Sequence, residues 1–164
     1  MIRGERFREV DVRLTTWMAK NGIFILRISI GVIFTWFGML KFFPTLSPAE
    51  SLATKTIEIL SFGLIESRTG VVILAIWESI IGLGFILGRY LREIILLLFV
   101  QMMGTIAPVF LFPEDVFRTV PFILTLEGQY IVKNLVVLSG GIVVGATVRG
   151  GRLIADPDDE NVKY

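Results

Sequence analysis

Four separate blocks of apolar residues constrain this chain more than any other feature of its sequence. They cover residues 22–43, 71–88, 93–113 and 130–148. Each block is close to the ~20 residues that an α-helix needs to cross a hydrocarbon core of about 30 Å. The whole chain is 54% apolar and 19% charged, whereas soluble domains have about 25% charged residues. The sequence therefore predicts an all-α membrane protein with a bundle of four transmembrane helices.

Polar and amphipathic segments surround this membrane domain of residues 22–148. In residues 1–21, charged side chains alternate with apolar ones at helical spacing, which predicts a cytoplasmic amphipathic helix lying on the membrane surface. A second interfacial helix is expected over about 48–64, because Ser47-Pro48-Ala49-Glu50 has the order of a capping box. Residues 149–164 are predicted to form a polar cytoplasmic tail.

The short link at residues 89–92 and the distribution of basic residues predict the topology. A link of four residues is so short that the second and third spans must be antiparallel neighbours. Basic side chains of short loops collect on the cytoplasmic side. Ten lie on the side of the two termini and this link: Arg3, Arg6, Arg8, Arg13, Lys20, Arg89, Arg92, Arg149, Arg152 and Lys163. The opposite loops hold only Lys55, Arg68 and Arg118, so both termini are predicted to be cytoplasmic.

Two residue types are absent from the sequence, and they limit the chemistry of the chain. Without Cys it cannot form disulfides, cysteine-ligated zinc sites or iron–sulfur clusters, and without His it lacks the usual haem ligand. The net charge of +1 gives no reason to expect a nucleic-acid partner. Independent catalysis is therefore not expected, no metal site is predicted, and any redox chemistry requires a bound organic cofactor or a partner chain.

The polar residues within the spans fall on helix faces that should point into the bundle, because charges in the membrane usually pair and point inward. Glu78 lies nearest the middle of its span, at a depth that the long side chains of Lys41 and Lys133 can reach. Gln101 and Asn134 could complete its hydrogen bonding. The intramembrane cluster predicted from these faces consists of Arg27, Lys41, Glu78, Gln101, Tyr130, Lys133 and Asn134.

Three interpretations of this cluster remain open at the level of sequence. The first is a structural clamp that fixes the register of the helices. In the second, Tyr130 and Lys133 bind the carbonyls of a quinone and Glu78 exchanges its proton. The third is a proton or cation path through Glu78, although flanking cations favour a permanently ionised carboxylate over alternating protonation.

Two stretches of the sequence resemble the DoxX-like membrane proteins. The first runs from Arg27-Ile28-Ser29-Ile30-Gly31 to Phe37-Gly38-Met39-Leu40-Lys41-Phe42, and the second is Trp77-Glu78 followed by Ile81-Gly82-Leu83-Gly84. A third run, Leu126-Glu127-Gly128-Gln129-Tyr130 with Lys133-Asn134, is similar to the YkgB-type branch, which includes a reactive-chlorine resistance membrane protein. The resemblance adds Glu127, in the outer loop, to the candidate site residues.

This resemblance implies a multi-pass protein of the bacterial inner membrane. It further implies an accessory or structural membrane component linked to oxidative or reactive-chlorine stress resistance. The alternatives are a membrane subunit of a quinone-linked oxidoreductase and a small proton-coupled transporter that uses Glu78. Apart from the lipid bilayer, the candidate partners are a redox protein and further copies of the chain. No cofactor is required by the sequence, and quinone is the candidate to consider.

Overall fold

The computed structural model describes residues 2–44 and 50–151, and most of them are helical. The elements are α1 (Ile2–Leu40), α2 (Glu50–Leu60), α3 (Ser67–Leu87), α4 (Leu91–Leu111), α5 (Pro113–Val116), β1 (Phe117–Thr119), β2 (Ile123–Leu124) and α6 (Leu126–Thr147). Four of these helices, α1, α3, α4 and α6, are long and apolar enough to cross a membrane. The predicted helical fold with four spans is therefore confirmed.

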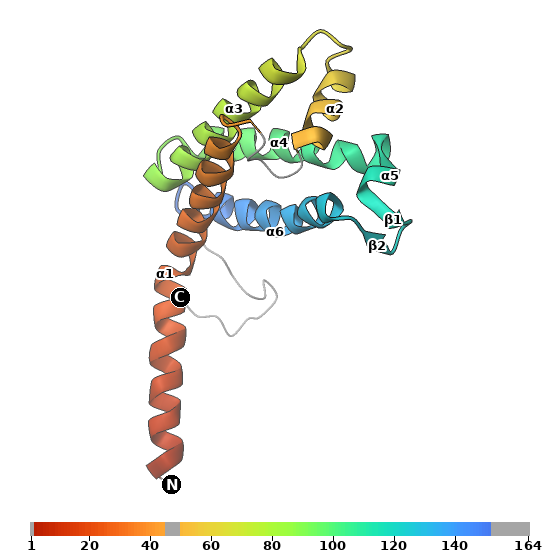
Figure 1. The fold of residues 1–164 in the computed structure, drawn as a ribbon. Coiled ribbons are helices and arrows are strands. Elements are labelled where there is room, and N and C mark those ends of the chain that lie inside the picture. Colours follow the sequence, from red (N-terminus) through yellow and green to blue (C-terminus); the bar gives the residue numbers. More distant parts are fainter. Residues whose placement is uncertain (1, 45–49, 152–164) are drawn as a thin grey trace.

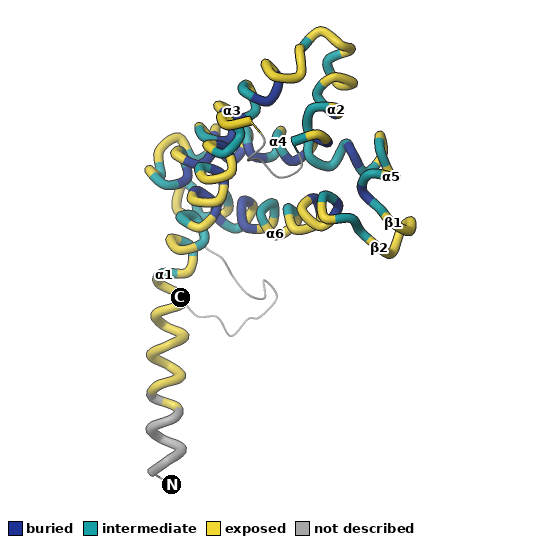
Figure 2. The backbone as a smooth tube through the Cα atoms, in the orientation of Figure 1, coloured by how far each residue is buried: buried dark blue, intermediate teal, exposed yellow. Residues whose placement is uncertain are grey.

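The four long helices are joined by one apolar core. Its buried members come from all four: Ile30 and Phe34 of α1, Ile81 and Phe85 of α3, Ile94, Ile95, Leu98 and Met102 of α4, and Val144 of α6. The most extensive helix pair is α1 with α3, while α6 packs on α4 and α1 (Figure 1). Buried residues line these contacts, and the outward faces are exposed (Figure 2). Exposed apolar residues such as Met103 and Val136 are suited to contact lipid.

The N-terminal segment differs from the prediction of a separate surface helix. Residues 2–21 continue the helix of the first span without a break, and α1 reaches 39 residues. At 1.5 Å per residue this is about 58 Å, nearly twice the thickness of a bilayer core. The physical reason is that residues 17–27 contain no proline, and a single glycine at position 22 is tolerated inside a helix. The N-terminal half of α1 therefore projects from the bundle (Figure 1).

A second, smaller apolar cluster lies at the other end of the bundle. It joins Leu52 of α2, Val116 of α5 and Ile131 of α6. The helix expected over about 48–64 is present as α2, and the Ser47 cap proposed for it lies outside the described residues. Thr125 caps α6 by accepting a hydrogen bond from the backbone N–H of Gly128 at 3.1 Å. The short hairpin of β1 and β2 was not expected, because two-residue and three-residue strands leave no periodic pattern in a sequence.

A surface ion pair connects α2 and α5 at this end of the structure. Lys55 Nζ of α2 lies 2.8 Å from Asp115 Oδ2 of α5. The hydrogen bond to Asp115 and its negative charge raise the pKa of Lys55 above its ordinary value of 10.5. Because the folded-state pKa is raised, the contribution of the pair to stability is present at neutral pH. This contribution is lost only as the pH rises through the raised, folded-state pKa of Lys55.

The contact between α1 and α3 is unusually close because glycines meet at the crossing. A Cβ built on Gly82 would collide with the Thr35 backbone nitrogen and Oγ1, and would lie 2.8 Å from the Gly31 carbonyl oxygen. A Cβ built on Gly31 would in turn lie 2.9 Å from the carbonyl oxygen of Gly82. Small residues at a crossing let two helix backbones approach, and in lipid this packing replaces the hydrophobic effect as the source of association.

We predict that Gly82→Ala destabilises the protein by about 1–3 kcal/mol, the usual effect of inserting a methyl group into a filled contact. Gly104→Ala on α4 is the matched control, because a Cβ there meets nothing within 4 Å. Thermal unfolding of both variants in mild detergent measures the difference. Equal melting temperatures for the two variants would show that α1 and α3 are not in this close contact.

Candidate functional site

The candidate site is built around Glu78, which lies at the middle of α3 and is only 8% exposed. Lys41, just beyond the end of α1, donates a hydrogen bond from Nζ to Glu78 Oε2 at 2.6 Å. Gln101 of α4 donates from Nε2 to Glu78 Oε1 at 3.1 Å. One carboxylate therefore links three of the four long helices, with one donor on each of its oxygens.

The backbone around Lys41 is held by a residue that the sequence did not single out. The last turn of α1 tightens into hydrogen bonds between residues three apart, such as Lys41 N–H to Gly38 O at 3.2 Å. Arg68, in the first turn of α3, donates from Nη2 to the Phe42 carbonyl oxygen at 2.7 Å. A basic side chain satisfies carbonyl groups at the end of a helix in this way. Arg68 lies 26 residues from Phe42 in the chain. This contact could not be predicted from the sequence, in which Arg68 was counted only as a basic residue of an outer loop.

Gly38 allows α1 and α3 to lie close together beside the ion pair. A Cβ built on Gly38 would lie 3.1 Å from Glu78 Cβ and 3.0 Å from the backbone nitrogen of Ser79. Such distances are tighter than almost all real Cβ contacts. The missing side chain at Gly38 therefore allows α1 and α3 to approach at the level of Glu78, so that Lys41, three residues further along the chain, meets the carboxylate.

Arg27 belongs to a different contact from the one predicted. Its guanidinium lies beside Gly88, in the space that a Cβ there would fill. Gly88 ends α3 in the left-handed conformation at φ 68°, which glycine adopts without strain. A cation at the C-terminal end of a helix interacts favourably with the helix dipole. Arg27 is 14 residues from Lys41, about 21 Å along α1, and so it does not join the Glu78 group.

The α6 residues of the predicted cluster do not meet Glu78 either. Lys133 is exposed, and its Nζ lies 5.6 Å from the centre of the Tyr130 ring. Asn134 is half-buried, and within residues 2–44 and 50–151 no hydrogen bond joins Lys133, Tyr130 or Asn134 to Glu78. These residues lie apart from Glu78 because α6 packs mainly against α1 and α4 rather than against α3, the helix that carries Glu78. Glu127 is half-buried in the first turn of α6, where a negative charge favours the helix N-terminus.

The observed group is a compact, charge-balanced unit. The side chains of Lys41 and Glu78 retain only 13% and 11% of their exposure. The two charges neutralise each other, and the amide of Gln101 satisfies the remaining carboxylate oxygen. In a medium of low dielectric constant such a satisfied network fixes the relative positions of its helices, whereas an unpaired member would be costly. Among the described residues, no three carboxylates gather as a metal site would require.

We predict that replacing one member of the pair is more damaging than replacing both. Glu78→Gln leaves the Lys41 ammonium without its counter-charge, and breaking a buried pair in this way costs up to about 3–5 kcal/mol. The double variant Glu78→Gln/Lys41→Gln removes both charges and should recover most of the lost stability. Unfolding free energies from denaturation in detergent give the coupling between the two sites. Lys133→Gln, on the exposed side of α6, is the control, and additive effects of the two single changes would contradict a clamp.

Comparison with known proteins identifies the family of the chain. Neither the search of curated proteins nor the search of solved structures finds a match to the chain. The DoxX family model matches residues 22–112, more than half of the chain. This match contains Lys41, Glu78 and Gln101 and ends before α6 begins. The four apolar helices and this match together identify the chain as an integral membrane protein that belongs to the DoxX family.

Proposed function

We propose that this DoxX-family protein is a non-catalytic, accessory component of the membrane that contributes to resistance against oxidative or reactive-chlorine stress. The observation that supports the non-catalytic part is the Lys41–Glu78–Gln101 group. Its carboxylate is buried, paired and hydrogen-bonded on both oxygens. A carboxylate that is buried, paired with a cation and hydrogen-bonded on both oxygens is suited to act as a clamp between helices.

Two contacts in the structure weigh against the quinone-linked and transporter alternatives. A quinone site would require Tyr130 and Lys133 to converge on Glu78, but these residues lie together at the exposed surface of α6. A transport path through Glu78 requires the carboxylate to exchange partners during a cycle. The 2.6 Å contact with Lys41 instead holds it in one arrangement.

The stress-related part of the proposal rests on the resemblance of residues 126–134 to the YkgB-type branch. In the structure this run begins at the Thr125 cap and contains Gly128, where a Cβ would collide with the Val116 carbonyl oxygen. The run therefore forms the junction between α6 and the smaller apolar cluster. The absence of Cys and His fits an accessory role, because protection would then depend on what this protein assembles with in the membrane.

We predict that cells without this protein survive hypochlorite less well, and that the wild-type chain restores survival. If the role is accessory, survival should follow the amount of folded protein in the membrane. Lys133→Gln and the double variant Glu78→Gln/Lys41→Gln should then protect as well as the wild type at equal abundance. Unchanged survival after deletion would refute the stress role. A double variant that is folded and abundant but gives no protection would show that Glu78 acts chemically.

We further propose that the protein lies in a bacterial inner membrane with both termini in the cytoplasm. The basic residues of the N-terminal segment and the 89–92 link support this orientation, since they outnumber those of the opposite loops. The predicted side of the membrane can be tested cleanly, because the natural chain has no cysteine to interfere with labelling.

Single cysteines at two exposed positions provide that test. Leu64, 86% exposed between α2 and α3, should become accessible to a membrane-impermeant maleimide in intact spheroplasts when changed to Cys. Arg92→Cys, near the turn between α3 and α4, should react only after the membrane is opened. The reverse labelling pattern would place the termini outside.

A further inference from the structure

The basic residues at the two ends of the bundle differ in whether they have partners. Toward the end that carries α2 and α5, Lys41 and Lys55 each pair with a carboxylate. The opposite end, where α1 leaves the bundle and α3 turns into α4, includes four cations: Lys20, Arg27, Arg89 and Arg92. Within residues 2–44 and 50–151, none of these four side chains has an ion pair or a hydrogen bond.

Arg27 lies deepest in its span among these cations. It is five residues inside the apolar block that begins at residue 22, about 8 Å along the helix. Its half-buried guanidinium lies beside Gly88, at the C-terminal end of α3. That end offers only about half a negative charge, whereas a charge at membrane depth usually has a full partner. The positive charge of Arg27 is therefore incompletely balanced by the chain.

The guanidinium of Arg27 can be reached by a ligand. In the described part of the chain, Thr35 Oγ1 is the one buried side-chain polar atom without a hydrogen-bond partner. Because the nitrogens of Arg27 also have no partner, they must lie at the accessible surface. A guanidinium presents five N–H donors in a planar fork, which suits the oxygens of a phosphate group.

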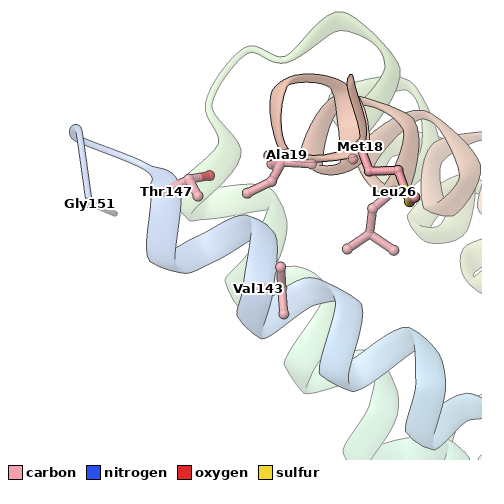
Figure 3. A pocket seen from close by; sticks show the side chains of 8 residues that line it. Met18, Ala19, Leu26, Val143, Thr147 and Gly151 are labelled. Carbon is pink, nitrogen blue, oxygen red and sulfur yellow. The ribbon is translucent and has the colours of Figure 1, made fainter. Parts of the chain in front are cut away.

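Lys20 lies on the same face of α1 as Arg27. The two residues are seven positions apart, which at 3.6 residues per turn places them within about 20° of each other and about 10 Å apart along the axis. An apolar groove beside α6 opens on another face of α1, where Ala19 and Leu26 lie opposite Val143 (Figure 3). Successive helix residues differ by about 100°, so Lys20 and Arg27 are turned away from this groove. The contact of Arg27 with Gly88 shows that their face is directed toward the end of α3.

Arg89 adds a third cation at this corner, because it directly follows Gly88 and is exposed. Few acidic residues are near it in the sequence: residues 12–40 of α1 and residues 88–92 contain no Asp or Glu. The nearest carboxylate along the chain is Glu93, which is exposed in the first turn of α4 and forms no salt bridge with the described cations. The corner between α1 and the end of α3 therefore carries uncompensated positive charge.

The surroundings of Arg27 favour a lipid over a soluble anion. The corner lies where the apolar block of α1 begins and that of α3 ends, which is the level of lipid headgroups. The ring of Phe24, which is 57% exposed, has its centre 5.4 Å from Arg27 Cζ. Leu87, in the last turn of α3, is 67% exposed. A phospholipid supplies both a phosphate for the cations and acyl chains for these apolar side chains.

We propose that Arg27, Arg89 and Lys20 form a binding site for an anionic phospholipid at the corner between α1 and the end of α3. Arg27 binds the phosphate through its forked donors, and the acyl chains lie along the exposed surface beside Phe24 and Leu87. The charges of Arg89 and Lys20 favour an anionic headgroup over a zwitterionic one, as basic residues at the ends of membrane helices do. The site is separate from the clamp and does not depend on the proposed stress role.

The test is native mass spectrometry of the full chain in mild detergent, with phosphatidylglycerol or phosphatidylcholine of identical acyl chains. We expect the wild type to retain phosphatidylglycerol preferentially. Each basic residue near a membrane surface favours anionic lipid by roughly fivefold, so Arg27→Gln should lower this preference by at least that factor. Arg118→Gln is the matched control, because Arg118 is an exposed cation of β1 at the other end of the bundle. It should keep the preference of the wild type.

Circular dichroism and melting temperature establish whether the variants are folded. If Arg27→Gln does not fold, Lys20→Gln/Arg89→Gln removes two exposed cations outside the apolar core and should lower the preference in the same way. A folded variant at the corner that keeps the same preference as Arg118→Gln would overturn the proposal. Equal retention of the two lipids by the wild type would also overturn it.

Two further measurements identify other occupants of the corner. Glycerol 3-phosphate carries a phosphate without acyl chains, and it should not displace phosphatidylglycerol at equal concentration. Equal competition would show that the corner binds a free phosphate instead of a lipid. The chain also has acidic residues outside the described part: Asp156, Asp158, Asp159 and Glu160. Selective lipid binding that arises only when these four are changed to their amides would show that this segment neutralises the cations, and would overturn the proposal.

Discussion

The close approach of α1 and α3 is the constraint on which the rest of the bundle depends. Gly31 and Gly82 remove the side chains that would hold these helices apart, and their backbones meet at the crossing. In lipid, apolar side chains gain little by moving from acyl chains to other helices, so the helices associate through close packing and polar contacts. The apolar core around Phe85 and Leu98 fills the space that this crossing defines.

The ion pair at Glu78 is a consequence of the same approach. Gly38 brings the two backbones together at the level of the carboxylate, and Arg68 holds the turn from which Lys41 reaches it. A charge at the middle of a span is expensive unless it is paired. Because the pair forms only when α1 and α3 are in register, the cost of separating the charges opposes any other arrangement of these two helices, and the Gln101 hydrogen bond adds α4 to the group.

The two ends of the bundle differ in character. At the end that carries α2, α5 and the hairpin, a small apolar cluster and the Lys55–Asp115 pair close the structure. At the opposite end α1 projects as a long helix, and an apolar groove beside it stays open. The Glu78 group is thus buried and paired, while the open surface lies where the helices meet the polar edge of a membrane.

The sequence by itself determined the four membrane helices, because the length and composition of an apolar block are local properties set by the thickness of a bilayer. It also placed Lys41 and Lys133 at a depth within reach of Glu78, since residue depth follows from helix rise alone, and it offered Gln101 and Asn134 as further hydrogen-bond partners. Only the tertiary structure decided that Tyr130, Lys133 and Asn134 lie apart from Glu78 and that Arg27 contacts the end of α3 at Gly88. Which helix lies beside which depends on close contacts between distant glycines and backbones, and the spacing of polar residues along one helix carries no record of its neighbours. For the same reason the role of Arg68 and the groove between α1 and α6 emerged only from the folded chain.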